Sequence, residues 1–255
     1  MNKTNQEILD IDYREMKPGF PLSNYVESFW MLSNVSDQEK QIVILPDGRI
    51  DLIFSFEDRD NITLLGVDSE PSRAVLAPKT AMFAVSFKLL AIEYLFKDKF
   101  PVLVDTAYNL PSDYFGISIQ DFENFEGFCD LLSSKFLSIL NHEIDERKRK
   151  LFDLIYNSNG EITIAEIAET IHWNSRQINR YFNQRFGISL KAYCTILRFR
   201  ATFQQIKEGK LFPEQNFTDQ AHFIKNIKKF SGVTPKELNK NINDRFIQLS
   251  TLKKK

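Results

Sequence analysis

Cysteine is scarce in this sequence and poorly placed for a disulfide framework. The two cysteines, Cys129 and Cys194, lie far apart, and neither belongs to a Cys-x-x-Cys pair or to a histidine-rich stretch. Disulfide frameworks belong to oxidising compartments, whereas isolated thiols are typical of reducing ones. We therefore expect a cytoplasmic protein whose two thiols are buried.

Long apolar runs are also absent. No stretch approaches the roughly 20 apolar residues that are needed to span a bilayer. Residues 1–10 are polar and of mixed charge, and so lack the basic start and apolar run of a secretion signal. We expect no membrane partner.

Signatures of metal binding and catalysis are missing as well. The three histidines have no cysteine, histidine or carboxylate partner at ligand spacing; they are His142, His172 and His222. There is no glycine-rich phosphate loop and no Ser, His and Asp set in a recognisable context. We expect no enzyme, no catalytic residue, no metal site and no cofactor.

Four carboxylates in the N-terminal half are the remaining candidates for acid–base chemistry: Asp47, Asp51, Glu57 and Asp58. Asp47 is explained by a turn, where a short polar side chain bonds its own backbone. The other three alternate along a predicted strand or end it, where polar residues face water. We therefore assign them no catalytic role.

What the sequence does have is a division of charge. Residues 161–255 contain 17 Lys and Arg against 8 Asp and Glu, whereas residues 1–160 contain 16 against 26. A basic third next to an acidic body indicates that the two parts meet different partners, the basic one a polyanion. A charged surface that serves only solubility is the alternative that charge alone leaves open.

The first half has the pattern of a small β-domain. Runs rich in Val, Ile and Phe predict strands at residues 41–45, 50–56, 62–67, 74–76 and 82–87. Between the first two, Pro46-Asp47-Gly48-Arg49 predicts a hairpin turn. Five strands at this spacing predict a small barrel or sandwich.

After residue 89 the period becomes helical. Apolar spacing predicts a short helix near residues 90–95, a helix over 125–141 and a further helix that ends near Asn157. The turn cluster Asn157-Ser158-Asn159-Gly160 marks a domain boundary.

Residues 161–187 are the most informative stretch. Thr163 and Glu166 fit a capping box, and an apolar stripe at helical spacing follows: Ile164, Ile167, Ala168 and Ile171. After a turn at His172-Trp173, Asn174 can cap a second helix that Gly187 ends. Helix, tight turn and helix is the geometry that places a second helix in the DNA major groove.

The exposed face of this second helix has the composition of a base-reading surface. It contains no acidic residue between positions 174 and 187, and Arg, Asn and Gln can form paired hydrogen bonds with guanine and adenine edges. The candidate DNA-binding residues are Asn174, Ser175, Arg176, Gln177, Asn179, Arg180, Asn183 and Gln184.

A partial repeat follows. Gly187-Ile188-Ser189-Leu190-Lys191 is echoed by Gly232-Val233-Thr234-Pro235-Lys236, and each follows an amphipathic basic helix that ends in Phe. Ser189 caps a predicted helix that runs past Ile206 to Gly209 and would join the two copies. The second basic helix, residues 218–230, adds the candidates Thr218, Gln220, His222, Lys225, Lys228 and Lys229.

Over residues 150–240 the sequence resembles the AraC-type (AraC/XylS) family of bacterial transcription regulators. The matching words are Ile164-Ala165-Glu166-Ile167-Ala168, Asn179-Arg180-Tyr181-Phe182, Phe186-Gly187-Ile188-Ser189, Tyr193, Arg198 with Ala201, Asn216-Phe217-Thr218-Asp219-Gln220-Ala221-His222-Phe223 and Gly232-Val233-Thr234-Pro235. The N-terminal half resembles a subset of these regulators through Pro21-Leu22, Tyr25-Val26-Glu27-Ser28-Phe29-Trp30 and Leu45-Pro46-Asp47-Gly48.

The resemblance implies an α+β protein with a β-rich, cupin-like small barrel and an all-α tandem helix-turn-helix domain. Its domains would be a sensor or dimerisation domain at residues 1–118, a helical linker at 119–157, the DNA-binding domain at 158–245 and a basic tail at 246–255. It implies double-stranded DNA as partner, with a small-molecule effector and RNA polymerase as further partners. The effector-binding residues stay unknown.

The second motif departs from the family pattern. Family members have a full helix before the second reading helix, whereas here seven residues join Gly209 to Phe217 and Pro213 opposes a helix. We expect the first motif to dominate base reading and the second to contact phosphate. A poorly braced second motif also motivates the hypothesis of a homodimer, which would recover affinity.

Two functions stay open. The first is a sequence-specific DNA-binding transcription regulator that responds to an effector through its N-terminal domain. The alternative is a ligand-binding or interaction protein that keeps the same fold but has lost specific DNA binding through the shortened motif.

Overall fold

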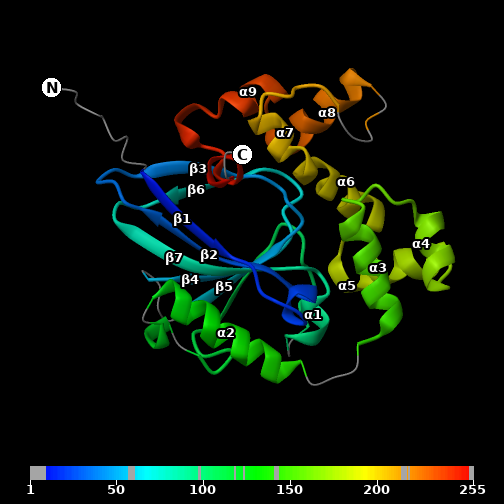
Figure 1. Cartoon of the computed structure of the whole chain (residues 1–255), viewed down its shortest axis with the longest axis horizontal. Helices are drawn as coiled ribbons and strands as arrows, with labels where there is room; N and C mark the ends of the chain where they lie inside the picture. The colour runs from blue at the N-terminus through cyan, green and yellow to red at the C-terminus, as the bar shows by residue number, and fades with distance from the viewer. Residues whose placement is uncertain are drawn as a thin grey trace.

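The computed structural model describes residues 10–56, 61–96, 99–117, 119–122, 124–140, 144–213, 217 and 219–252. Strands build its N-terminal half and helices its C-terminal half (Figure 1). In these residues no helix is both long enough and apolar enough to cross a membrane.

The described residues contain eight strands, which form two antiparallel sheets. They are β1 (Ile11–Met16), β2 (Val26–Asn34), β3 (Lys40–Ile44), β4 (Ile50–Ser55), β5 (Asn61–Leu65), β6 (Ser72–Leu76), β7 (Thr80–Phe87) and β8 (Ala107–Pro111). Six strands pair in the order β1-β2-β7-β4-β5-β8, and β3 pairs with β6 in the second sheet. The second sheet lies over one face of the first, which closes a small β-domain (Figure 1).

The five predicted strands correspond to β3, β4, β5, β6 and β7, but the hairpin between the first two is wrong. β3 pairs only with β6, while β4 pairs with β5 and β7. Residues 46–49 therefore carry the chain from one sheet to the other. Gly48 turns with φ +77°, a value that glycine adopts without steric cost.

Aromatic packing joins the larger sheet to the helix that covers its outer face. This helix, α2 (Phe125–Ile139), agrees with the helix predicted over residues 125–141. Phe128 is fully buried and meets Phe29 and Phe54 edge to face, at centroid distances of 6.1 and 5.5 Å. Three short helices complete the N-terminal half: η1 (Leu22–Asn24), α1 (Ala91–Tyr94) and η2 (Ile119–Asp121).

The C-terminal half is helical throughout its regular structure. Its elements are α3 (Glu146–Asn157), α4 (Ile164–Ile171), α5 (Ser175–Phe186), α6 (Leu190–Ala201), α7 (Phe203–Lys207), α8 (Gln220–Ser231), α9 (Pro235–Lys240), η3 (Ile242–Asp244) and α10 (Ile247–Thr251). The helix predicted from residue 190 to beyond 206 is divided at Thr202 into α6 and α7. The α+β class, with a β-rich half, an all-α half and a shortened second motif, is confirmed.

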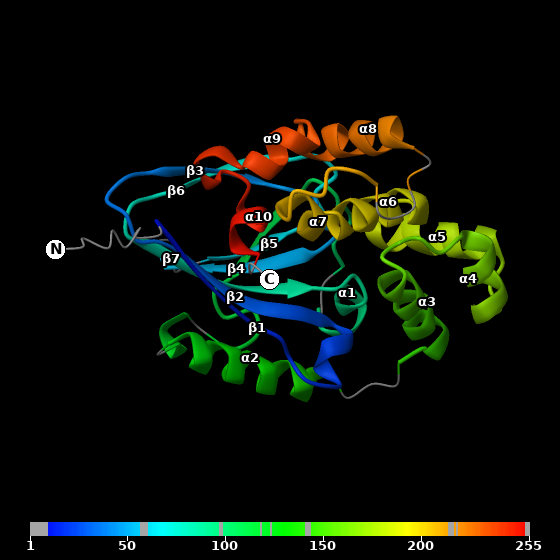
Figure 2. The ribbon, with the colours of Figure 1, turned by 45° about the horizontal axis from the view of Figure 1, so that its top comes forward.

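The C-terminal segment returns to the β-domain. Gln248 exchanges two side-chain hydrogen bonds with the backbone of Leu45, at 2.9 and 3.0 Å, and Val43 N donates to Arg245 O at 2.6 Å. Ile247 and Leu249 are buried. Thus residues 246–252, the described part of the predicted basic tail, are folded against the first half (Figure 2). The division into domains itself stays a prediction.

Candidate nucleic-acid interface

Helices α4 and α5 form the predicted helix-turn-helix, and their ends carry the predicted caps. Thr163 and Glu166 form a reciprocal capping box at the start of α4, and Asn174 and Gln177 form a second one at the start of α5. His172 makes the turn between them with φ 56°. Both caps are built from residues within four positions of each other, which is why the sequence predicts them.

The buried side of α5 fixes its position against α4 and α6. Ile178, Phe182 and Phe186 are at most 1% exposed, as are Ile167 and Ile171 on α4. The Phe182 and Phe186 rings meet at 5.4 Å between centroids. A helix held by this much buried apolar surface presents its other face in one orientation.

The opposite face of α5 is exposed. Seven of the eight predicted residues are exposed and Asn179 is partly buried. Asn174 and Gln177 are engaged in the cap, and the amides of Asn179 and Asn183 donate to the backbone of the preceding turn. The other four candidates form no hydrogen bond or ion pair through their side chains in the described structure: Ser175, Arg176, Arg180 and Gln184. Among them, Arg176, Arg180 and Gln184 have side chains long enough to form two hydrogen bonds with a base edge.

A third side of α5 contacts the β-domain. The Tyr181 hydroxyl donates to the carboxylate of Glu93 on α1, and Arg185 donates to the carbonyl oxygen of Ile92 at 3.0 Å. Lys148 on α3 also pairs with Glu93. The contact with the acidic half therefore uses residues between the buried and exposed faces, and the predicted reading face stays open.

Helix α8 is the predicted second reading helix, and it begins at Gln220 with Asp219 as its cap. His222, Lys225, Lys228 and Lys229 are exposed. Gln220 is partly buried, and its amide nitrogen donates to Leu211 O at 3.0 Å. Thr218, the remaining candidate, lies outside the described residues.

The chain before α8 is not helical in its described positions, 210–213 and 217. Instead of a bracing helix, the ring of Phe217 meets Phe223 edge to face at 5.1 Å. Phe230 stacks on Phe199 of α6 at 5.2 Å, and this contact anchors the far end of α8. At these described positions the structure therefore agrees with the prediction that α8 lacks a preceding helix.

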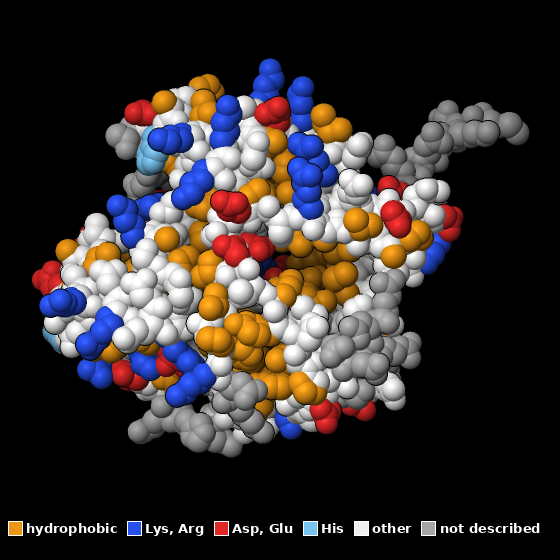
Figure 3. Space-filling view, turned by 180° about the vertical axis from the view of Figure 1, so that it is seen from behind, with side chains coloured by type: hydrophobic (Ala, Val, Ile, Leu, Met, Phe, Trp, Pro, Cys, Tyr) orange, Lys and Arg blue, Asp and Glu red, His pale blue; other side chains and the backbone are white. Residues whose placement is uncertain are grey.

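Basic side chains gather over the second motif. Seen from behind, Lys and Arg side chains project from the upper part of the molecule, where α8 and α9 lie (Figures 1 and 3). Whether these side chains and those of α5 contact DNA stays a prediction.

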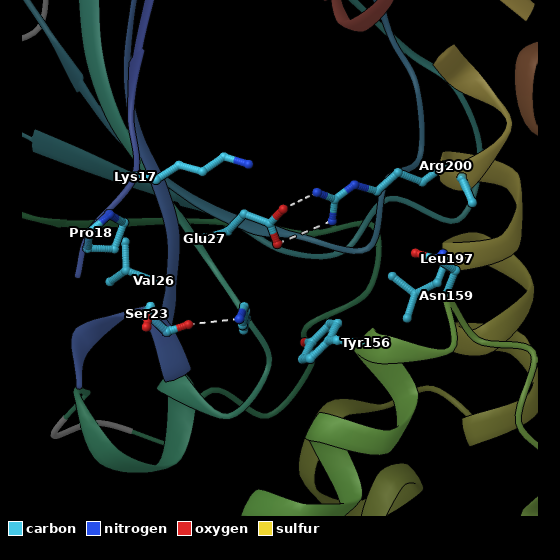
Figure 4. A pocket seen from close by; sticks show the side chains of 11 residues that line it. Lys17, Pro18, Ser23, Val26, Glu27, Tyr156, Asn159, Leu197 and Arg200 are labelled. Atoms are coloured by element: carbon cyan, nitrogen blue, oxygen red, sulfur yellow. Dashed lines mark hydrogen bonds and ion pairs between the residues drawn. The ribbon is translucent and has the colours of Figure 1, made fainter. Parts of the chain in front are cut away.

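A cavity of about 390 Å³ separates the two halves (Figure 4). Lys17 and Glu27 line it from the β-domain, and Tyr156 and Arg200 line it from α3 and α6. Burial alone would raise the pKa of Glu27, but the charge and hydrogen bonds of Arg200 lower it to about 2. The pair is therefore ionised at neutral pH and joins the halves.

The connection between the sheets is a second point of contact between the halves. Tyr193 on α6 is fully buried, and its hydroxyl donates to Gly48 O at 2.9 Å. A Cβ on Gly48 would lie 2.9 Å from Cδ2 of Leu197. No local pattern in the sequence indicates this contact, because its partners are 145 positions apart.

A second cavity, of about 310 Å³, lies between the two sheets. Asp47 and Asp51 both line it, so the expectation that Asp51 faces water is wrong. Strand alternation assigns Asp51 to one face of β4, but the second sheet covers that face. Glu57 and Asp58 lie outside the described residues.

Comparison with known proteins gives one family model and one curated relative. Residues 14–109 match the family model of a domain of unknown function, DUF6597. A stretch of 159 residues, 58% of this chain, is 23% identical to the uncharacterized HTH-type transcriptional regulator YtdP of Bacillus subtilis (strain 168). The printed name of this relative, an HTH-type transcriptional regulator, agrees with the resemblance to the AraC-type regulators. The chain spans about a fifth of YtdP, 19% of its length.

Among solved structures, ToxT of Vibrio cholerae is similar over most of its length. One ToxT structure is 12% identical, with a TM-score of 0.42 over 89% of this chain and 96% of that one. Another, bound to (E)-4-(8-methylnaphthalen-1-yl)but-3-enoic acid, is 14% identical, with the same TM-score and the same coverage of both chains.

Proposed function

We propose that this chain is a sequence-specific DNA-binding transcription regulator of the AraC type that reads bases through α5. The observation that supports it best is the exposed, unengaged set of Arg176, Arg180 and Gln184 on a helix fixed by a buried apolar face. Arg pairs with guanine and Gln with adenine through two hydrogen bonds each, and each good pair gives about 1–3 kcal/mol of discrimination.

Helix α8 has a different task in this proposal. Its exposed side chains are mainly lysines, which meet phosphate as point charges, and Gln220 already donates to Leu211. Lys225, Lys228 and Lys229 would therefore hold the phosphate backbone, while α5 reads the bases. With one base-reading helix in each chain, a homodimer on two half-sites would supply the remaining affinity.

The β-domain is proposed to sense a small-molecule effector. Asp47 and Arg49 line the cavity between the sheets, and Gly48 between them accepts the hydrogen bond of Tyr193 on α6. A ligand that moves this loop therefore acts on the helix that joins the two motifs. RNA polymerase stays a partner that only the resemblance implies.

The first experiment selects duplexes from a random library with the purified protein and measures binding of the selected and a scrambled duplex by fluorescence anisotropy. Arg180→Ala should weaken binding to the selected duplex about 10- to 100-fold and leave the scrambled duplex nearly unchanged. Arg14→Ala, which removes an equal charge from exposed strand β1, is the matched control and should change neither.

The alternative, a ligand-binding or interaction protein without specific DNA recognition, makes the opposite prediction. No duplex would then be enriched, and any binding would weaken uniformly with salt for all sequences. Light scattering of the protein, free and on the selected duplex, tests the dimer: a monomeric mass in both states contradicts it.

A further inference from the structure

The cavity between the sheets has an apolar wall and a charged end. Ile42, Leu65, Leu76 and Met82 line the wall, and Ile247 of α10 contributes to it from the C-terminal segment. Its volume of about 310 Å³ lies at the lower end of the roughly 300–1,000 Å³ that is usual for small-molecule sites. An occupant is therefore small and mostly apolar.

Carboxylates outnumber cations at the charged end. Asp47, Asp51 and Asp68 line it together with a single arginine, Arg49. The Nε atom of Arg49 lies 2.9 Å from Oδ2 of Asp47, which compensates the charge of Asp47. Within the described residues, no lysine, arginine or histidine forms an ion pair with Asp51 or Asp68. When all three carboxylates are ionised, an excess of two negative charges remains.

Asp51 is held in place rather than free to turn away. The indole nitrogen of Trp30 donates to the Ser86 hydroxyl at 2.9 Å, and this hydroxyl donates to Asp51. Ser86 is 1% exposed. The chain of donors fixes the carboxylate at the end of the apolar wall, which is a preorganised position for a counter-ion.

Arg49 has an unsatisfied hydrogen-bond donor at the charged end of the cavity. Its Nε atom is buried and makes no hydrogen bond of ordinary geometry within the described chain, although Asp47 lies close. A buried donor without an acceptor is costly. Because this donor is buried against Asp47, it offers no contact to an anionic occupant.

We propose that this cavity binds a small molecule with an apolar body and one cationic nitrogen, which pairs with Asp51 and Asp68. The body lies along the apolar wall under Ile247, and the bound cation neutralises charge that the protein leaves uncompensated. An anionic ligand is excluded by the negative excess, since Arg49 is already paired with Asp47. The role of this ligand as an effector rests on the proposed function, whereas its binding does not.

The acidity of the two carboxylates agrees with this geometry. Burial and the charge of Asp47 raise the pKa of Asp51 to about 6, against the lowering effects of Arg49, Ser86 and Trp30. Burial and the charges of Asp47, Asp105 and Asp51 raise the pKa of Asp68 to about 7. These carboxylates carry a charge that their surroundings disfavour, and a cation would relieve that cost.

The test uses calorimetric titration of the full chain with phenethylammonium, hexylammonium and benzamidinium at pH 8, and with two matched probes, 3-phenylpropanoate and 2-phenylethanol. At least one cation should bind, and both matched probes should bind at least tenfold more weakly. Asp51→Asn and Asp68→Asn should each lower affinity for that cation about tenfold or more. Asp130→Asn, which changes an exposed carboxylate of α2, is the matched control and should leave this affinity unchanged.

Equal binding of the alcohol or tighter binding of the carboxylate overturns the proposal, as does no saturation by any cation up to about 10 mM. Affinity should also rise between pH 5 and pH 8 as Asp51 and Asp68 ionise; an affinity independent of pH contradicts their role. Binding of the selected duplex is measured on the same preparation. If the duplex binds and no cation does, this inference fails and the proposed function stands.

Discussion

The two helix-turn-helix regions differ in what holds the second helix of each. In the first, α4 and α5 each begin with a capping box, and the two helices share an apolar core. In the second, α8 has one aspartate cap, and the chain before it is not helical at its described positions, 210–213 and 217. Base reading requires side chains placed within about half an ångström, whereas phosphate contact tolerates more. The surfaces follow the same division, with Arg and Gln free on α5 and lysines on α8.

The largest expected effect comes from removing the brace of the first motif. Ile167→Ala empties a fully buried position of α4, and we expect a loss of about 2–4 kcal/mol in the free energy of unfolding in urea. The preference for the selected duplex should fall with it, while salt-dependent binding to any duplex remains. Val75→Ala, 58% exposed, is the control. A destabilised variant with full sequence preference would contradict the role of the brace.

Removing the cap of α5 or of α8 should affect sequence preference differently in the two motifs. Asn174→Ala and Asp219→Ala each remove a side chain that accepts a backbone N–H, at a cost of about 1 kcal/mol. We expect Asn174→Ala to reduce the ratio of selected to scrambled binding in anisotropy titrations. Asp219→Ala should lower both affinities alike. The same change of ratio in both variants would mean that the motifs share base reading.

A smaller effect is expected for a single lysine of α8. Lys228→Ala should reduce the slope of log affinity against log salt concentration by about 0.9, because one phosphate contact is lost. Between 50 and 200 mM salt the affinity of the variant should therefore fall about 3.5-fold less than that of the unchanged protein, equally for selected and scrambled duplexes. Arg14→Ala should leave the slope unchanged. A loss confined to the selected duplex would assign Lys228 to a base.

The smallest effect is expected for Gln220→Ala. Its amide already donates to Leu211, so we expect less than about a twofold change in affinity and no change in sequence preference. The measurement is the same selected-against-scrambled titration. If Gln220→Ala reduced preference as much as Arg180→Ala does, the division of tasks between the motifs would be wrong.

The helical half could be predicted closely because its signals are local. The caps of α4 and α5, the turn at His172 and the left-handed Gly187 all depend on residues a few positions apart. The spacing and Pro213 also predicted that no full helix precedes α8, and the described positions 210–213 and 217 are not helical. The sequence did not predict which side chains of α5 are free to bind. Four of the eight candidates are engaged in the helix cap or in hydrogen bonds to the backbone of the preceding turn.

The β-domain was predicted less well because pairing is not local. Turn residues at positions 46–49 indicate a turn but not which strands it joins, and β3 pairs with a strand about thirty residues on. β8 escaped prediction because it ends in Pro111, which reads as a loop residue; as the edge of the sheet it tolerates the missing donor. The placement of Asp47 and Asp51 in the cavity could not be predicted for the same reason, because it depends on the passage of residues 46–49 from one sheet to the other.

The return of Gln248 to Leu45, 203 positions earlier, affects how the molecule assembles. On the ribosome, the strands emerge long before the segment that covers the opening between their sheets. The first half therefore waits, with Ile42 and Leu76 lacking their contact with Ile247, until the reading helices have been synthesised. Final closure then joins the two halves in one late, long-range step, and a chain stopped short of it leaves an apolar opening exposed to aggregation.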